Sequence, residues 1–161
     1  MLDGPVRILF ICYGNLCRSP LAEAVFKHQV AQAGLRAAFE IASAGVGVWH
    51  VGDPPDPRMC ATALAHGIDM SRQRGRKLSP SDLHRHHLVL AMDRSVLAQA
   101  RQIVPGGSSP LALFRHFDPA ADSPDVPDPF YGADAGFEEV FAIVERTSRA
   151  LLEQLSMRYG P

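Results

Sequence analysis

The chain lacks any hydrophobic run long enough to cross a membrane. Its longest uninterrupted apolar stretch covers residues 8–13, whereas a membrane-spanning helix needs about 18 apolar residues or more. Arg7 and Arg18 flank this stretch without the small-residue cleavage pattern of a secretory signal. The sequence therefore predicts a soluble, cytoplasmic protein that neither enters a membrane nor is exported by the general secretory route.

The chain is also short of net charge and of cysteine. Sixteen lysines and arginines oppose seventeen aspartates and glutamates, so the formal charge is only −1 and provides no broad positive field for nucleic acid. Three cysteines, Cys12, Cys17 and Cys60, are too few and odd in number for a disulfide framework. At least one thiol is therefore free, which favours a reducing compartment.

Apolar runs alternate along the chain with stretches of helical periodicity. The expected strands are residues 6–12, 39–44, 88–92 and 111–114, and the expected helices are 20–33, 57–66, 93–102 and 137–155. With 47% hydrophobic and 20% charged residues, residues 1–161 should form a single globular domain. The alternation favours an α/β fold with an open parallel sheet between helices on both faces, where ligands bind at the carboxyl ends of strands.

The segment after the first expected strand combines residue types with distinct chemical roles. Gly14 and Asn15 enter left-handed conformations at low cost, so the backbone amides of the turn can converge on an anion. The following helix adds its positive end, and the planar guanidinium of Arg18 matches two oxygens of a phosphate. Both charges favour the thiolate of Cys12, to which Ser19 can donate a hydrogen bond. These features predict a nucleophilic cysteine in an anion-binding loop.

An isolated cysteine is more often a small core residue than a nucleophile. Core packing, however, does not require glycine, asparagine, arginine and serine at fixed distances from the thiol, so the C-x5-R-S spacing favours the nucleophile. The nucleotide-binding pattern G-x4-G-K-[ST] is absent, and a reactive thiol would have no role in such a loop.

These residues resemble the loop of the low molecular weight protein tyrosine phosphatase family, V-C-x-G-N-x-C-R-S-P, which stands here as I-C-Y-G-N-L-C-R-S-P over residues 11–20. Further matches follow in family order at residues 43–45, 56–58, 91–93 and 128–132. The resemblance implies a flavodoxin-like three-layer fold around a four-stranded parallel sheet. It also implies hydrolysis of phosphotyrosine in proteins or peptides, and of small aryl phosphates, through a cysteinyl-phosphate intermediate without metal or cofactor.

The resemblance also implies a role for each loop residue. Cys12 is the nucleophile, and Arg18 stabilises the transferred charge together with the loop amides. Inorganic phosphate and other oxyanions should compete for the same loop. The residues expected to bind phosphate are Tyr13, Gly14, Asn15, Leu16, Cys17, Arg18 and Ser19.

The leaving oxygen needs a proton, and the loop contains no acid to supply it. Four aspartates in the proline-rich segment at residues 105–129 are candidates, and the residues alone do not distinguish them: Asp118, Asp122, Asp125 and Asp128. The resemblance assigns this role to Asp128. The next residue, Pro129, stiffens the loop that carries it. The same carboxylate would then activate the water that hydrolyses the intermediate.

Substrate choice is expected to depend on a deep aromatic pocket. Tyr13, Trp49, Phe130 and Tyr131 are expected to form a slot through which an aryl phosphate reaches the thiolate, while a shorter seryl phosphate does not. The alternative for Trp49 is an ordinary core tryptophan. Its glycine-rich loop and the presence of an aromatic residue at this family position favour the pocket rim.

In the family, residues matching Asn15 and Ser43, with Ser19 beside them, hold the loop in its curl by hydrogen bonds. A histidine often joins that network, but Arg72 or Gln73 stands at its position here. The resemblance therefore implies a supporting network that lacks one family member.

Relatives also use a cysteine pair as a reversible cap on the nucleophile. The pair corresponds to Cys12 and Cys17, which implies reversible inactivation by peroxide through a disulfide. The alternative is that Cys17 only packs. Cys60, on a helix, is expected in the core.

Two charged clusters carry weaker signals. The basic run at residues 72–77 is more often a solvated face than a surface for an acidic partner, and both interpretations stay open. His84, His86 and His87 lack a second ligand group at zinc-like spacing, so no metal site is expected.

Two other functions compete with the phosphatase interpretation. An arsenate reductase of the same fold would need further redox cysteines, and none follows Cys60. A phosphotyrosine- or oxyanion-binding module without turnover would not need the nucleophile, the arginine and the acid together.

Overall fold

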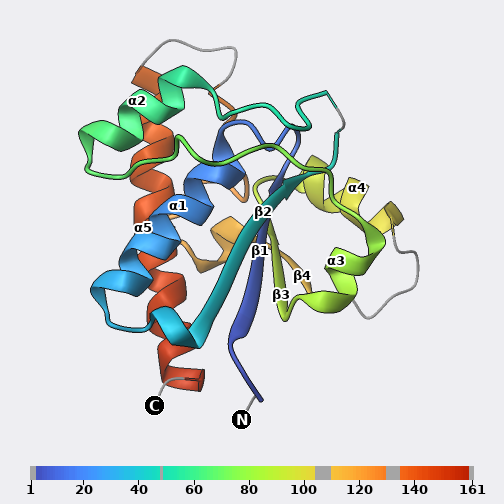
Figure 1. The fold of residues 1–161 in the computed structure, drawn as a ribbon, viewed down its shortest axis with the longest axis vertical. Helices are drawn as coiled ribbons and strands as arrows, with labels where there is room; N and C mark the ends of the chain where they lie inside the picture. Colours follow the sequence, from blue (N-terminus) through green and yellow to red (C-terminus); the bar gives the residue numbers. More distant parts are fainter. Residues whose placement is uncertain (1–2, 48, 104–109, 130–134, 160–161) are drawn as a thin grey trace.

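The structure, a computed structural model, describes residues 3–47, 49–103, 110–129 and 135–159. Its centre is a sheet of four parallel strands in the order β2-β1-β3-β4 (Figure 1). The strands are β1 (Val6–Cys12), β2 (Phe39–Gly45), β3 (Leu88–Ala91) and β4 (Leu111–Leu113). The predicted α/β fold with a parallel sheet is confirmed.

β1 lies in the middle of the sheet because its side chains are apolar on both faces. Residues 8–11 are fully buried, as expected for a parallel strand that is covered on both sides. The pairing with β2 places Cys12 opposite Gly45 at the carboxyl end of both strands. Cys12 therefore lies at the edge of the sheet where ligands bind in folds of this kind.

Helices cover both faces of the sheet, as predicted. One face carries α1 (Arg18–Gln32), α2 (Pro57–Ala65) and α5 (Ala135–Tyr159), and the other carries α3 (Pro80–Arg85) and α4 (Arg94–Ile103) (Figure 1). Phe10 of β1 packs with the first group, whereas Leu9 and Ile11 pack with the second. No helix in the described ranges is long and apolar enough to cross a membrane.

Short elements account for the differences from the sequence prediction. α3 is not predicted from the sequence because its six residues are too few to show a helical period. A capping pattern does mark its start: Pro80 follows Ser79, whose backbone N–H donates to the Asp82 carboxylate (2.9 Å). The sequence analysis also misses the one-turn helix η1 (Arg36–Ala38), and the last residue of the strand predicted at 111–114 instead begins η2 (Phe114–Phe117).

The chain after η2 is held by a buried carboxylate. Asp118 accepts hydrogen bonds from Arg115 Nε (3.0 Å), from Arg146 Nε and Nη2 (2.7 and 2.8 Å) and from the backbone N–H of Ala120 (2.9 Å). Its side chain is fully enclosed. The hydrogen bonds from Arg146 are the main reason that the pKa of Asp118 lies well below its usual range. Asp118 thus ties η2 and the following loop to α5.

We predict that Asp118→Asn lowers the free energy of unfolding at neutral pH by about 3 kcal/mol, because it removes the buried carboxylate that pairs with Arg146 and with Arg115. The pKa of Asp118 is lower in the folded than in the unfolded chain. Its contribution is therefore complete above the ordinary aspartate pKa of about 3.9 and is lost as the pH falls through the folded value. Urea unfolding of both proteins at about pH 7 and about pH 3 should show the difference shrinking in acid. An equal difference at both pH values would contradict this account.

Candidate active site

The loop between β1 and α1 folds back over the sulfur of Cys12. The backbone N–H of Asn15 donates to Cys12 Sγ (3.2 Å), and the hydroxyl of Ser19 lies 2.9 Å from the same sulfur. Asn15 has a φ of 55° and is the only non-glycine residue with positive φ in the described ranges. This left-handed turn aims its amide at the sulfur, where a thiolate would accept the hydrogen bond.

Of the two residues that could adopt a left-handed conformation in this turn, Asn15 does so and Gly14 does not. Within the loop, positive φ occurs only at Asn15. A Cβ on Gly14 would lie 3.0 Å from Cδ2 of the His50 ring. The glycine at this position allows close packing of His50 and does not serve the turn itself.

The end of β2 approaches the loop so closely that it admits no side chain. A Cβ on Gly45 would lie 2.9 Å from three backbone atoms of the loop. The next two amides bind the loop directly, because Val46 N–H donates to the Cys12 carbonyl (3.0 Å) and Gly47 N–H donates to the Tyr13 carbonyl (2.8 Å). The loop is therefore supported by the neighbouring strand.

A hydrogen-bond network behind the loop joins the three supporting residues named from the resemblance. Asn15 Nδ2 donates to the hydroxyls of Ser19 (2.9 Å) and Ser43 (3.0 Å). The network extends to two groups that the sequence analysis misses. Ser43 donates to Glu23 Oε1 (2.7 Å), and the backbone N–H of Arg76 donates to Asn15 Oδ1 (3.0 Å). Every polar atom of the Asn15 side chain is thus engaged.

Gln73, near the position of the family histidine, makes a different contact. Its Nε2 donates to the backbone carbonyl of Pro20 (3.0 Å), inside α1. The amide oxygen of Asn15 is instead bound by the backbone of Arg76. The network keeps its donors to Asn15 without a histidine.

Arg18 begins α1 and is only 3% exposed. Its Nη1 donates to Asp93 Oδ2 (2.7 Å) and to the carbonyl of Val126 (3.0 Å), and its Nη2 lies 3.6 Å from Asp128 Oδ2. Burial alone would lower the pKa of Arg18, but the charge of Cys12 and the hydrogen bond to Asp93 outweigh it and raise the pKa. The guanidinium is therefore a fixed positive charge beside the sulfur.

Asp93 has a second role beyond the predicted helix cap. One carboxylate oxygen accepts from Val96 N–H (2.8 Å) and so caps α4, while the other binds Arg18. The contact with Arg18 is not predicted from the sequence. The sequence does contain a clue to this contact. Asp93 lies near the carboxyl end of β3, at the same edge of the sheet at which Cys12 ends β1.

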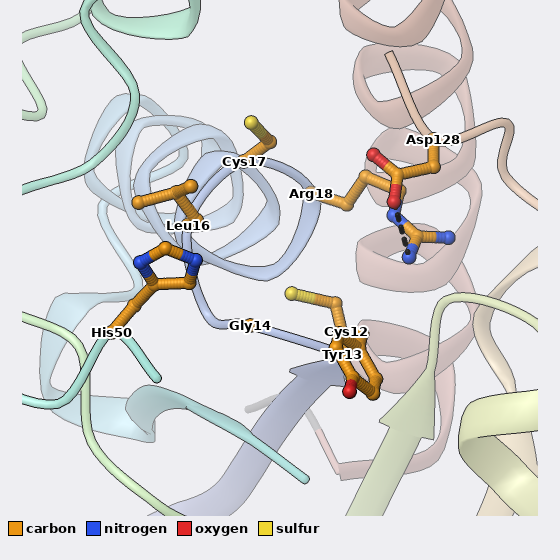
Figure 2. Close-up of a pocket in the computed structure, with 8 residues that line it drawn as sticks. All are labelled: Cys12, Tyr13, Gly14, Leu16, Cys17, Arg18, His50 and Asp128. Carbon is orange, nitrogen blue, oxygen red and sulfur yellow. Dashed lines mark ion pairs between the residues drawn. The ribbon is translucent and has the colours of Figure 1, made fainter. Parts of the chain in front are cut away.

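A pocket of about 270 Å³ opens over the Cys12 sulfur. Figure 2 shows this sulfur pointing into the hollow, with Arg18 and Asp128 on one side and Leu16 and His50 on the other. The lining residues are Cys12, Tyr13, Gly14, Leu16, Cys17, Arg18, His50 and Asp128. Among the four candidate acids, only Asp128 lies in this set.

The other three candidate acids are engaged by arginines elsewhere. Asp118 is enclosed between two of them, Asp122 is 86% exposed beside Arg115 (2.8 Å), and Asp125 pairs with Arg94 (3.1 Å). The structure therefore separates four carboxylates that the sequence alone leaves equivalent.

His50 is a pocket residue that the sequence analysis misses. Its loop is drawn in by Gly75, which exchanges backbone hydrogen bonds with Gly52 and Asp53 (both 2.8 Å). A Cβ on Gly75 would lie 2.2 Å from the carbonyl oxygen of His50, so only glycine allows this approach. The sequence feature that could have indicated a pocket role for His50 is its position directly after Trp49 in a glycine-rich loop.

The aromatic residues of the predicted slot are partly described. Tyr13 and Trp49 stack with ring centroids 5.8 Å apart and planes at 24°. Tyr13 lines the pocket. Trp49 is not among the lining residues and is 70% exposed, which excludes a core role. Phe130 and Tyr131 lie outside the described residues.

The three cysteines are free and differ in their surroundings. Cys17 is buried in the pocket wall, and burial raises its pKa far above the ordinary value, so its sulfur is a neutral thiol. In Figure 2 its sulfur points away from that of Cys12. Cys60 is half-buried against the core, less enclosed than predicted.

The two weaker clusters are occupied by local contacts. Arg76, within the basic run, pairs with Asp82 (3.0 Å). His87 Nδ1 accepts from the backbone N–H of Arg7 (2.9 Å), and His86 Nδ1 lies 2.8 Å from the Asp82 carbonyl. Burial lowers the pKa of both histidines. Within the described ranges, no group of three or more His, Cys, Asp or Glu side chains is arranged to hold a metal ion.

Comparison with known proteins assigns the chain to a family. Residues 7–159 match the family model described as low molecular weight phosphotyrosine protein phosphatase. A low molecular weight protein-tyrosine-phosphatase of Streptomyces coelicolor is 42% identical over 150 residues, which cover 91% of each chain. A low molecular weight phosphotyrosine protein phosphatase of Schizosaccharomyces pombe is 39% identical over 153 residues, covering 94% of this chain and 97% of that protein.

The fold gives the same result. A crystal structure of a protein tyrosine phosphatase from Entamoeba histolytica, with Hepes in its active site, superposes with a TM-score of 0.91 at 29% identity. The match covers 95% of this chain and 98% of that one. The chain belongs to the low molecular weight phosphotyrosine protein phosphatase family.

Proposed function

We propose that this protein hydrolyses phosphotyrosine in proteins or peptides, and small aryl phosphates, through a cysteinyl-phosphate intermediate. The observation that carries the proposal is the meeting of three groups in one pocket: the Cys12 sulfur, the Arg18 guanidinium and the Asp128 carboxylate. A nucleophile, a fixed positive charge and an acid are the groups that phosphate-ester cleavage requires.

In the first step, Cys12 Sγ attacks phosphorus and the bond to the tyrosine oxygen breaks. Asp128 gives its proton to the departing oxygen, which leaves as neutral tyrosine. Arg18 binds equatorial oxygens of the phosphoryl group, whose negative charge is spread over them in the transition state. Its contacts with Asp93 and Val126 hold the guanidinium in place before substrate arrives.

In the second step, water attacks the phosphorus of the cysteinyl phosphate. Asp128, now a carboxylate, takes a proton from that water, and the bond between sulfur and phosphorus breaks. The departing thiolate accepts hydrogen bonds from the Ser19 hydroxyl and the Asn15 amide, which already lie at 2.9 and 3.2 Å. Inorganic phosphate leaves, and other oxyanions compete for the same loop. The Hepes molecule in the Entamoeba active site, which carries a sulfonate, supports this affinity.

Selection of aryl esters follows from the pocket walls. Tyr13, its stacked partner Trp49 and the opposite wall of Leu16 and His50 suit a flat ring above the loop. Phe130 and Tyr131 complete this slot in the proposal. An arsenate reductase remains the less supported function, since no cysteine follows Cys60.

We predict that Cys12→Ser abolishes turnover of p-nitrophenyl phosphate while inorganic phosphate still binds, because the serine hydroxyl is a far weaker nucleophile than a thiolate. Steady-state assays with a chelator present, together with calorimetric phosphate titration, test both parts. Absence of turnover in folded wild-type protein would instead support a binding module. Loss of wild-type turnover on adding chelator would contradict the metal-free mechanism.

We predict that Asp128→Asn lowers kcat by about 10²–10⁴, the range expected for loss of general acid–base catalysis. Asp122→Asn, in the same segment but exposed and away from the pocket, is the matched control and should keep nearly full activity. Phosphate affinity should change little in either variant. An unchanged kcat for Asp128→Asn would move the acid role to another residue.

We further propose that oxidation regulates this enzyme, which acts in the reducing cytoplasm. Peroxide oxidises the Cys12 thiolate to a sulfenic acid, and the Cys17 thiol displaces its hydroxyl as water to form a disulfide. The proximity of the two cysteines in one loop supports this step, which requires the Cys17 sulfur to turn toward Cys12.

We predict that a dithiol restores the activity of peroxide-treated wild-type protein, because the disulfide protects Cys12 from irreversible oxidation. The Cys17→Ser variant should lose most of this recovery. Cys60→Ser, which changes a thiol outside the loop, is the control and should recover as the wild type does. Full recovery of Cys17→Ser would overturn the regulatory role of Cys17.

A further inference from the structure

Three consecutive residues after β3 bind either Arg18 or the segment that leads to Asp128. The carbonyl of Met92 accepts from Val126 N–H (2.7 Å), and the carboxylate of Asp93 binds Arg18. Arg94 binds Asp125, which belongs to the segment that leads to Asp128. The function proposed above uses the contact of Asp93 with Arg18, but it assigns no role to Arg94.

The contact between Arg94 and Asp125 is more specific than an ordinary surface ion pair. Arg94 Nε and Nη2 lie 3.3 and 3.1 Å from Asp125 Oδ2, and Nε lies 3.2 Å from Oδ1. The backbone N–H of Arg94 also donates to Oδ1 (2.9 Å). These hydrogen bonds hold the pKa of Asp125 below its usual value, so the carboxylate stays charged and bound. A forked arrangement of this kind fixes direction as well as distance.

The chain between Asp125 and Asp128 is short and firmly held. Val126 is buried, and its backbone N–H and carbonyl bind Met92 and Arg18. Pro127 restricts the next φ angle. The anchor at Asp125 is therefore one of a few fixed contacts, all within three residues of Asp128, that together set where the Asp128 carboxylate lies.

A second arginine supports the same segment from inside. Arg115 is 4% exposed and donates from Nη1 to the carbonyl of Asp125 (2.9 Å). Its other nitrogens bind Asp118 and Asp122. The backbone of Asp125 is thus held by the buried Arg115, while its side chain is held by the exposed Arg94.

We propose that Arg94 is a positioning residue for catalysis, which acts through Asp125 to hold Asp128 at proton-donating distance from the leaving oxygen. This proposal rests on the proposed function, in which Asp128 is the general acid. Arg94 itself touches neither the substrate nor the reacting atoms.

The proposal predicts an effect that depends on the leaving group. Tyrosine leaves as a strong base, with a pKa of about 10, so its departure needs a well-placed proton donor. The nitro group of p-nitrophenolate delocalises its charge, and this anion leaves with much less help. A displaced Asp128 should therefore slow phosphotyrosine cleavage more than p-nitrophenyl phosphate cleavage.

The experiment compares kcat/KM for these two substrates in Arg94→Gln, Asp125→Asn, the double variant and Asp128→Asn. Arg94→Gln should lower the phosphotyrosine value about two- to fivefold, the size of an exposed charge pair, and the p-nitrophenyl phosphate value less. The double variant should lose no more than Asp125→Asn alone, because both changes break one contact. Inhibition by inorganic phosphate should be unchanged.

Arg85→Gln is the matched control. Arg85 also forms an exposed ion pair, 3.4 Å from Glu40, and within the described residues it has no hydrogen bond or ion pair with residues 125–128. It should match Arg94→Gln in melting temperature while leaving both kcat/KM values unchanged.

Two results would overturn the role of Arg94 while leaving the phosphatase intact. One is an equal loss on both substrates in Arg94→Gln, and the other is kinetics identical to those of Arg85→Gln. A third result would show that the assignment of Asp128 as the general acid is itself wrong. If Asp128→Asn loses no more on phosphotyrosine than on p-nitrophenyl phosphate, Asp128 is not the proton donor, and the role of Arg94 falls with it.

Discussion

The buried positive charge of Arg18 is the constraint on which the rest of the site depends. A guanidinium that is almost fully removed from water is stable only where negative charges and carbonyls surround it. Those partners come from three separate places in the chain: Cys12 ends β1, Asp93 follows β3, and Val126 and Asp128 belong to the segment after η2. Compensation of the Arg18 charge therefore brings the end of β1, the residue after β3 and the segment after η2 together at one site. The same contacts that stabilise the folded chain also orient the guanidinium that we propose binds the transferred phosphate.

Much of this arrangement is predictable from local sequence. The apolar run of β1 predicts a strand buried on both faces, and the C-x5-R-S spacing predicts where the nucleophile and its arginine lie, because both patterns act within a few residues. The contacts that the sequence analysis misses are those made across long sequence distances. Nothing in the local sequence shows that the backbone of Arg76 binds the Asn15 side chain.

The four aspartates of the proline-rich segment show the same limit. All four have similar neighbours in the sequence, yet their surroundings in the fold differ. Asp118 is buried by arginines from η2 and α5, whereas Asp125 is bound by the first residue of α4. Asp128 also has a cation nearby, Arg18 at 3.6 Å, but it is the carboxylate that lines the pocket. Which of the four reaches the site therefore depends on tertiary structure. The family resemblance identifies Asp128 without these tertiary contacts. A motif marks which residue occupies the site, but it does not show which contacts place that residue there.

The strand order explains why a pocket exists at this position. The chain leaves β1 toward the face covered by α1 and leaves β3 toward the opposite face, covered by α4. Neighbouring strands whose connections diverge in this way leave an opening at their carboxyl ends. The pocket over Cys12 therefore forms where the two connections separate, and it requires no cavity in either hydrophobic core. Its walls are built by loops from several connections, so substitutions in these loops can reshape the pocket without altering either hydrophobic core.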